Sequence, residues 1–245
     1  MDQERRSGLV RLVQESAPLR RKITASLRQA IERGALKPGE RLVEKDLCRE
    51  LNVSRTSLRE AFRELEAEGL VTNNPRGMIV AQLTEHEANN IYRVRAALEA
   101  LAAEQFALGA DEATQRELDR VVESLEQAYN AKQFEQILST KREFYEILCR
   151  GADNFIVLDL LNRLNSRITQ LRSASLCDPR RGDASMAEIR ALAAALRARD
   201  AATARAAAIA HVEAAARYTA GIRRQGEIEA ASAANVIGRR SETAS

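Results

Sequence analysis

The chain has 245 residues, of which 45% are hydrophobic and 30% charged, so it can bury the core of one large domain or two modest ones. No apolar run follows the first residues, and no segment approaches the roughly 18 apolar residues of a membrane span, so we expect a cytoplasmic protein without membrane contact. The three cysteines, Cys48, Cys149 and Cys177, have neither metal-site nor disulfide spacing, which argues against a disulfide-rich secreted domain.

The net charge of +3 is unevenly distributed along the chain. Residues 1–82 carry 16 Lys and Arg against 12 Asp and Glu, a net charge of +4, whereas the remainder carries 22 against 23, a net charge of −1. The basic excess favours an anionic partner for the first third of the chain, although a solvated basic surface explains it about as well.

Three helices are predicted within the first 70 residues. Residues 19–32 have apolar side chains on one helical face, and Gly34 after them can end a helix in the left-handed conformation. A second, short helix at residues 44–51 is closed by Asn52, and Ser54 is a good N-cap for a third. The second and third helices therefore meet at a tight turn, as in a helix-turn-helix.

The third helix is predicted to have a basic face. Its apolar residues, at positions 58, 61, 62 and 65, form one stripe and leave Arg55, Arg59 and Arg63 on the other side at intervals of four residues. Arginine binds guanine O6 and N7 through two hydrogen bonds, or binds phosphates. We therefore expect this helix to enter the major groove of DNA, with Arg55 and Arg59 as the residues that contact bases.

Other side chains near the same turn are suited to the DNA backbone. Thr56 and Ser57 are short enough to contact phosphate oxygens at the positive end of the third helix, and Lys45 could reach the backbone from the second helix. The alternative is a solvated face on which the arginines pair with glutamates such as Glu60.

A β-hairpin is predicted after the third helix. Residues 70–72 and 78–80 are short β-like runs, and the segment between them contains Asn, Pro and Gly, which favour a turn. This pattern indicates the wing of a winged helix-turn-helix. Arg76 at the tip of the wing suits the adjacent minor groove or phosphates.

The rest of the chain is predicted to be helical. Thr84 and Glu87 form a capping box that begins a helix, so we place the domain boundary near residue 83. Six helices follow to about residue 222, and residues 223–245 are polar and weakly periodic, which favours a disordered tail. The expected fold is mainly α, with a winged helix-turn-helix at residues 1–82 and an all-α antiparallel bundle for effector binding or dimerisation at residues 83–222.

Several motifs carry a resemblance to a known family. They are EKDL at residues 44–47, LNVSRTSLREA at 51–61, LEAEGLV at 65–71 and the Arg76-Gly77 pair. Together they resemble the GntR family of bacterial transcription regulators. The second domain, with YRVRAALE at residues 92–99, is similar to the FadR branch of that family, whose effector domain is of the FCD type.

The resemblance implies a homodimer on a palindromic operator, with a small ligand in the helical domain that alters the affinity for DNA. It also implies the positions of the DNA contacts. These are Lys45, Ser54, Arg55, Thr56, Arg59 and the wing around Gly77.

Members of the FadR branch commonly hold a metal ion through one Asp and three His of the bundle, and the matching positions here are Lys141, Tyr145, Ile189 and His211. A Zn²⁺ or Ni²⁺ ion needs several deprotonated donors, and a lysine ammonium would repel it. We therefore expect no metal and no other cofactor.

Lys141 lies on an otherwise apolar face of its predicted helix. In one interpretation its ammonium replaces the charge of the metal and binds a small anionic effector, with Tyr145, His211 and Arg95 nearby. In another, the ammonium reaches water while the stem covers the core. In a third, the cavity is filled and the domain only dimerises. His211 alone is typical of a hydrogen-bonded core histidine.

Two other functional classes fit the sequence poorly. The chain has no Walker loop, GxGxxG, GxSxG or HExxH motif, and its two histidines provide little general-base capacity, so we do not expect an enzyme. A non-specific architectural DNA-binding protein would need more basic surface than the N-terminal region has. The expected function is a sequence-specific regulator that acts as a repressor.

Overall fold

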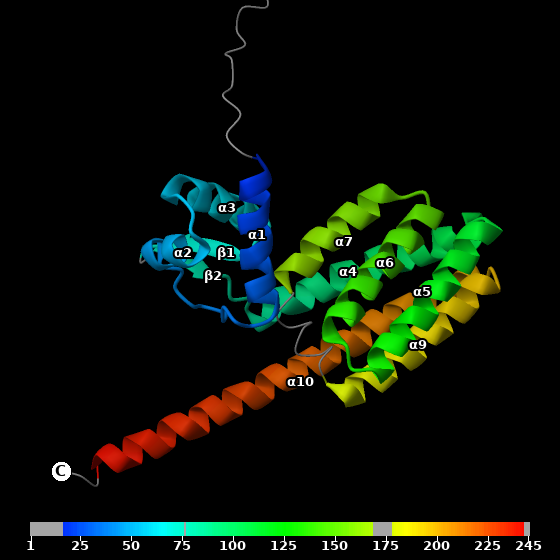
Figure 1. The fold of residues 1–245 in the computed structure, drawn as a ribbon. Coiled ribbons are helices and arrows are strands. Elements are labelled where there is room, and N and C mark those ends of the chain that lie inside the picture. Colours follow the sequence, from blue (N-terminus) through cyan, green and yellow to red (C-terminus); the bar gives the residue numbers. More distant parts are fainter. Residues whose placement is uncertain (1–16, 76, 169–177, 243–245) are drawn as a thin grey trace, which may run out of the picture. The chain divides into compact units, whose positions relative to one another are not determined.

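The computed structural model describes residues 17–75, 77–168 and 178–242, and it divides into two compact units, Met1–Ala81 and Gln82–Ser245 (Figure 1). The division lies one residue before the boundary that the sequence predicts. The fold is mainly α, as expected, with a two-stranded antiparallel hairpin in the first unit. None of the helices among the described residues is long and apolar enough to cross a bilayer.

The first unit contains three helices followed by the hairpin. In chain order they are α1 (Ala17–Glu32), α2 (Glu44–Leu51), α3 (Arg55–Ala67), β1 (Val71–Asn74) and β2 (Gly77–Val80). The helices agree with the prediction to within two residues, and the strands extend the predicted β-like runs toward the turn.

The turn between α2 and α3 forms for the local reasons that the sequence indicates. Asn52 adopts the left-handed conformation, with φ 51° and ψ 51°, and its N–H donates to the carbonyl oxygen of Cys48. Ser54 then caps α3, because its Oγ accepts a hydrogen bond from the N–H of Ser57 at 3.1 Å. These two residues fix the direction in which α3 leaves the turn.

The core of the first unit joins α1, α3 and the hairpin. In the hairpin Val71 pairs with Val80, which places both side chains in the core. Each fully buried side chain of this kind contributes about 1.5–3 kcal/mol relative to an exposed one. The largest buried residues contributed by the helices are Ile23, Leu27, Ile31, Leu58, Phe62 and Leu65.

The second unit is a helical bundle. Its described helices are α4 (Glu85–Gly109), α5 (Glu112–Asn130), α6 (Phe134–Gly151), α7 (Phe155–Arg167), α9 (Pro179–Arg197) and α10 (Ala201–Glu242). The predicted capping box is present at the start of α4, where Thr84 and Glu87 exchange hydrogen bonds. α4 packs against α6, α7, α9 and α10 and is therefore the central helix, while α5 lies beside α9 (Figure 1).

The disordered tail expected at residues 223–245 is wrong as far as Glu242, because α10 continues to that residue. Residues 223–242 contain no proline and include four alanines, the residue with the highest helix propensity. A helix that is already nucleated in the bundle gains one hydrogen bond for each residue that it adds, so weak periodicity does not stop it.

Gly151 allows α6 to approach α4 closely. A Cβ at Gly151 would lie 2.4 Å from Cδ2 and Cε2 of Phe106, whose ring is completely buried, whereas a Cβ at Gly221 in α10 would have no atom within 4 Å. We expect Gly151→Ala to lower the free energy of unfolding by about 1–3 kcal/mol through overpacking. Gly221→Ala, the matched control, should leave it unchanged or raise it by up to about 1 kcal/mol. Chemical denaturation followed by circular dichroism measures both, and equal effects would contradict this packing.

Candidate functional site

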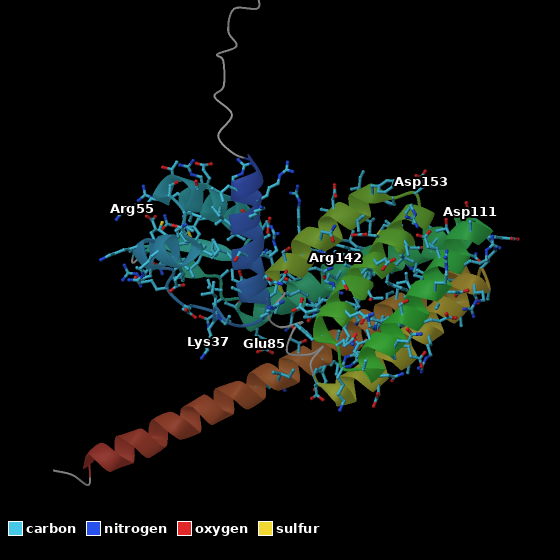
Figure 2. The ribbon with its side chains drawn as sticks, viewed as in Figure 1. Lys37, Arg55, Glu85, Asp111, Arg142 and Asp153 are labelled. Carbon is cyan, nitrogen blue, oxygen red and sulfur yellow. The ribbon has the colours of Figure 1, made fainter. Side chains whose placement is uncertain are left out.

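The basic face predicted for α3 is present. Arg55, Arg59 and Arg63 are exposed, whereas Leu58 and Leu65 on the opposite side are completely buried. Figure 2 shows Arg55 at the periphery of the first unit. The start of α3 therefore offers arginine side chains to a partner, and its apolar stripe attaches the helix to the core.

The exposed cations of this face differ in their partners. The Nε of Arg59 donates to both carboxylate oxygens of Glu44 in α2, at 2.9 and 3.1 Å, and this contact raises the pKa of Arg59. Arg63 pairs with Glu60 at 2.8 Å, within α3 itself. Over the described part of the chain, Arg55 and the exposed Lys45 form no ion pair, so two cations near the turn remain available.

The two serines at the start of α3 are engaged in the cap. The hydroxyl groups of Ser54 and Ser57 lie 2.9 Å apart, and Ser54 also accepts the backbone hydrogen bond that caps the helix. Thr56 lies between them and is exposed. Ser54 and Ser57 thus position the first turn of α3, and Thr56 presents a further exposed hydroxyl group.

A basic residue that the sequence analysis missed lies beside the wing. Arg76 lies outside the described residues, but Gly77 is described and has a φ of +107°. A Cβ at Gly77 would lie 3.9 Å from Nε of Arg41, so the exposed guanidinium of Arg41 lies beside the wing turn. Arg41 forms a β-bridge with Ile79. Positions 41–43 have the sequence Arg-Leu-Val, which does not alternate between polar and apolar residues, so no local sequence signal identifies this short extended segment.

The four residues predicted to surround an effector are buried in the second unit. Arg95 of α4, Lys141 and Tyr145 of α6, and His211 of α10 are each at most 6% exposed. Lys141 does not reach water, because its Nζ donates to Oγ of Ser185 in α9 at 3.0 Å and lies 5.7 Å from the centre of the Tyr129 ring. The snorkelling interpretation of Lys141 is therefore wrong.

Two of these residues meet at Glu99, which the sequence analysis missed. Nη2 of Arg95 donates to one oxygen of Glu99 at 2.6 Å, and the hydroxyl of Tyr145 donates to the other at 2.9 Å. Burial alone would lower the pKa of Arg95, but the charge of Glu99 raises it, so the guanidinium of Arg95 stays charged. The spacing of four residues between Arg95 and Glu99 on one helix is the signal that could have found it.

His211 belongs to a second group of hydrogen bonds. Its Nδ1 lies 2.7 Å from Oε2 of Glu188, and Arg181 donates two hydrogen bonds to the same carboxylate, at 3.0 and 2.8 Å. Burial lowers the pKa of His211, and the nearby charge of Lys141 lowers it further, against the opposing effect of Glu188. Burial favours a neutral Glu188, but the bonds from His211 and Arg181 lower its pKa. The expectation of a hydrogen-bonded core histidine agrees with this geometry.

The residues at the metal positions of the FadR branch do not fit a metal ion. Lys141 is a donor to Ser185, Ile189 is 2% exposed in the apolar core, and His211 is occupied by Glu188. Across the described segments, no group of three or more His, Cys, Asp or Glu side chains is arranged to hold a metal. A cationic ammonium and an aliphatic side chain cannot supply the donors that Zn²⁺ or Ni²⁺ requires.

Family models match both units of the chain. One, described as "Bacterial regulatory proteins, gntR family", matches residues 19–80, and the other, the FCD domain, matches residues 90–214. The chain is 35% identical over 144 residues to the uncharacterized HTH-type transcriptional regulator YdhC of Bacillus subtilis, a match that spans 58% of this chain and 64% of that protein.

Two further relatives are similar over comparable lengths. The HTH-type transcriptional regulator McbR of Escherichia coli is 30% identical over 142 residues, 56% of this chain and 63% of that protein. The gluconate operon transcriptional repressor of Bacillus licheniformis is 27% identical over 143 residues, 58% of this chain and 59% of the relative. Each match therefore covers less than two thirds of the relative.

Solved structures share the fold. E. coli McbR/YncC superposes with a TM-score of 0.70 at 24% identity, over 86% of this chain and 99% of that one. A putative GntR regulator from Rhodococcus sp. RHA1 gives a TM-score of 0.69 at 22% identity, over 82% and 97% of the two chains. With a helix-turn-helix unit that matches one family model and a helical unit that matches the other, the chain belongs to the GntR family of bacterial regulatory proteins and carries an FCD domain.

Proposed function

We propose that this protein is a sequence-specific transcription regulator that represses by binding operator DNA as a homodimer, and that a small anionic metabolite bound in the FCD domain changes its affinity for DNA. The observation that carries the proposal is the exposed basic start of α3, which is held by the left-handed turn at Asn52. Relatives named as HTH-type regulators and as a gluconate operon repressor support it.

The proposed roles of the DNA-contacting residues follow from their positions. Arg55 and Arg59 contact bases in the major groove, because they are exposed on the first two turns of α3. Lys45 and Thr56 contact phosphates, Ser54 and Ser57 hold the helix start, and Arg63 extends the basic face toward the backbone. In the wing, Gly77 permits the turn that carries Arg76, and Arg41 adds a cation beside it.

An apolar surface on the FCD domain is proposed to bind a second copy of the chain. Val94, Leu101 and Leu108 of α4 are spaced seven residues apart on one face, and their exposed fractions are 49%, 37% and 69%. The hydrogen bond from Asn154 to Gln105, 2.9 Å long, brings the start of α7 to this same face. Phe155, Ile156 and Leu160 of α7 are also exposed and extend the apolar surface.

A dimer accounts for this surface and for the size of the DNA contact. Exposed apolar patches of this extent mark association sites in soluble proteins. One short recognition helix buries little DNA surface, whereas two related half-sites supply the area that typical operator affinities need. We therefore assign the face of α4 and α7 to self-association.

The charges of the buried cluster support an anionic effector. Three buried cationic side chains, Arg95, Lys141 and Arg181, lie beside the carboxylates of Glu99 and Glu188. An anionic ligand would be attracted strongly to these cations, because electrostatic interactions in the interior are stronger than in water. One observation favours the alternative, a domain that only dimerises: each predicted effector residue already has a protein partner.

The DNA contacts can be tested with a duplex selected by the full-length protein from a random pool. We expect Arg55→Ala and Arg59→Ala each to lose about 1–3 kcal/mol of binding to the selected duplex, with little change in thermal stability because both side chains are exposed. Lys45→Ala should weaken binding to all duplexes alike and reduce the salt dependence. Wild-type affinity in Arg59→Ala, or no enriched sequence, would contradict the assignment.

The dimer can be tested by placing charge on the apolar face. We expect Leu108→Lys and Ile156→Lys, at positions 69% and 75% exposed, to convert a dimer into a monomer at micromolar concentration, because they bury an ammonium in the interface. Leu19→Lys replaces an exposed leucine of α1 and should leave the dimer intact. Sedimentation velocity gives the masses. A monomeric wild type, or dimers in all variants, would exclude this face.

The effector site can be tested by thermal denaturation with a panel of carboxylate and phosphate metabolites. A ligand of the native state raises the melting temperature, and Lys141→Met should abolish that shift while DNA binding by the ligand-free protein is unchanged. Arg142→Met, which removes the same charge from the adjacent exposed position (Figure 2), should keep the shift. If no metabolite raises the melting temperature, the alternative of a domain that only dimerises stands.

The metal content can be tested by elemental analysis of the purified protein. About one zinc or nickel per chain would overturn the conclusion that the residues at the metal positions do not fit a metal ion.

A further inference from the structure

The contact between Glu44 and Arg59 joins the two helices of the helix-turn-helix. Glu44 is the first residue of α2, and Arg59 lies in the second turn of α3, fifteen positions later in the chain. Both side chains remain accessible, since 34% of the Glu44 side chain and 64% of the Arg59 side chain are exposed. An exposed ion pair of this kind contributes little to stability, so folding gives little reason for it.

The atoms that make this contact leave the rest of the guanidinium accessible. Both hydrogen bonds come from Nε of Arg59, at 2.9 and 3.1 Å. Within the part of the chain that the structure describes, neither Nη of Arg59 donates a hydrogen bond. Arginine reads guanine through two parallel hydrogen bonds to O6 and N7, and the Nη groups can supply them while Nε stays on the carboxylate.

We propose that Glu44 is a positioning residue for DNA recognition, which holds Arg59 by its Nε edge so that the two Nη groups are oriented toward one base pair. This inference rests on the proposed function and adds a specificity-determining residue to it. Glu44 does not touch the base. It acts through Arg59 alone.

The physical effect is a reduced ordering cost at the moment of binding. An arginine side chain has many rotamers, and immobilising a side chain of this kind on association costs about 0.5–1.5 kcal/mol. Glu44 restricts those rotamers before DNA arrives. The positive N-terminal end of the α2 dipole attracts the carboxylate of Glu44 and helps to hold it at the start of the helix.

The same carboxylate opposes DNA binding in a way that does not depend on sequence. A negative charge beside the recognition helix repels the phosphates of any duplex, and removing it strengthens non-specific binding. Glu44 therefore affects the two kinds of binding in opposite directions: it favours the correct base pair through Arg59 and disfavours all DNA through its charge. A residue with only a structural role would not produce this pair of effects.

Asp46 provides a matched control. It lies in the same first turn of α2, and its carboxylate pairs at 3.2 Å with Arg49 of its own helix, a residue with no proposed contact to bases. Asp46→Asn therefore removes the same charge from the same helix end without releasing Arg59.

The experiment compares full-length wild type, Glu44→Gln and Asp46→Asn on two probes, the duplex selected by the wild type and a scrambled duplex of equal composition. For Glu44→Gln we expect tighter binding to the scrambled duplex and a fall of about two- to thirteen-fold in the ratio of the two affinities, the range that corresponds to the ordering cost. Asp46→Asn should strengthen binding to both duplexes alike and leave the ratio unchanged. Equal melting temperatures of the three proteins show that the fold is intact.

Single-base-pair variants of the selected duplex give the second readout. Glu44→Gln should relax the preference at the same base pair as Arg59→Ala, and adding Glu44→Gln to Arg59→Ala should cause no further loss of discrimination. The proposal is overturned if Glu44→Gln leaves the ratio of the two affinities at its wild-type value or raises it. It is also overturned if Glu44→Gln changes the discrimination between base pairs as much in the Arg59→Ala background as in the wild type. If the wild type itself binds both duplexes with equal affinity, the proposed function fails as well. When the wild type discriminates and Glu44→Gln does not behave as expected, only the role of Glu44 fails.

Discussion

Glu99 on the central helix α4 is 1% exposed, and a carboxylate at this depth needs cations and hydrogen-bond donors as neighbours, which constrains the packing of the FCD domain. Arg95 meets this need from the preceding turn of the same helix, and Tyr145 meets it from α6. The contact fixes the rotation of α6 against α4, because the hydroxyl of Tyr145 must reach one particular oxygen. Removing Arg95 would leave the carboxylate without its cation, and removing Tyr145 would take away the donor to its other oxygen.

The second polar group follows the same rule with different helices. Arg181 and His211 satisfy Glu188, and the ammonium of Lys141 is held by Ser185 and the face of Tyr129. Both groups lie among apolar side chains of the bundle, where electrostatic interactions are stronger than in water. Direct contacts between side chains thus connect α6, α9 and α10. An anion that binds here must displace some of these contacts and replace them with its own.

Charge is used differently in the DNA-binding unit. Its ion pairs near the turn, such as the one between Glu44 and Arg59, are accessible to solvent and contribute little to stability, and Arg55 and Lys45 also remain accessible there. The apolar stripe of α3 supplies the stability instead, through Leu58, Phe62 and Leu65. Exposed charges can bind phosphates and bases at small desolvation cost, whereas the buried charges of the FCD domain mainly orient helices. The exposed charges of the first unit therefore suit recognition of a polyanion.

The sequence by itself determined the helices, the turn at Asn52, the caps at Ser54 and Thr84, and the exposed face of α3, because these signals act within one or two helical turns. It also placed Lys141 and His211 correctly on buried faces. Only the tertiary structure decided which side chains these two contact, because Ser185 and Glu188 come from another helix. It also decided that Arg41 lies beside the wing through a β-bridge and that Glu44 contacts Arg59 across the turn. Partner choice depends on how helices pack, and that is set by the whole core rather than by local spacing.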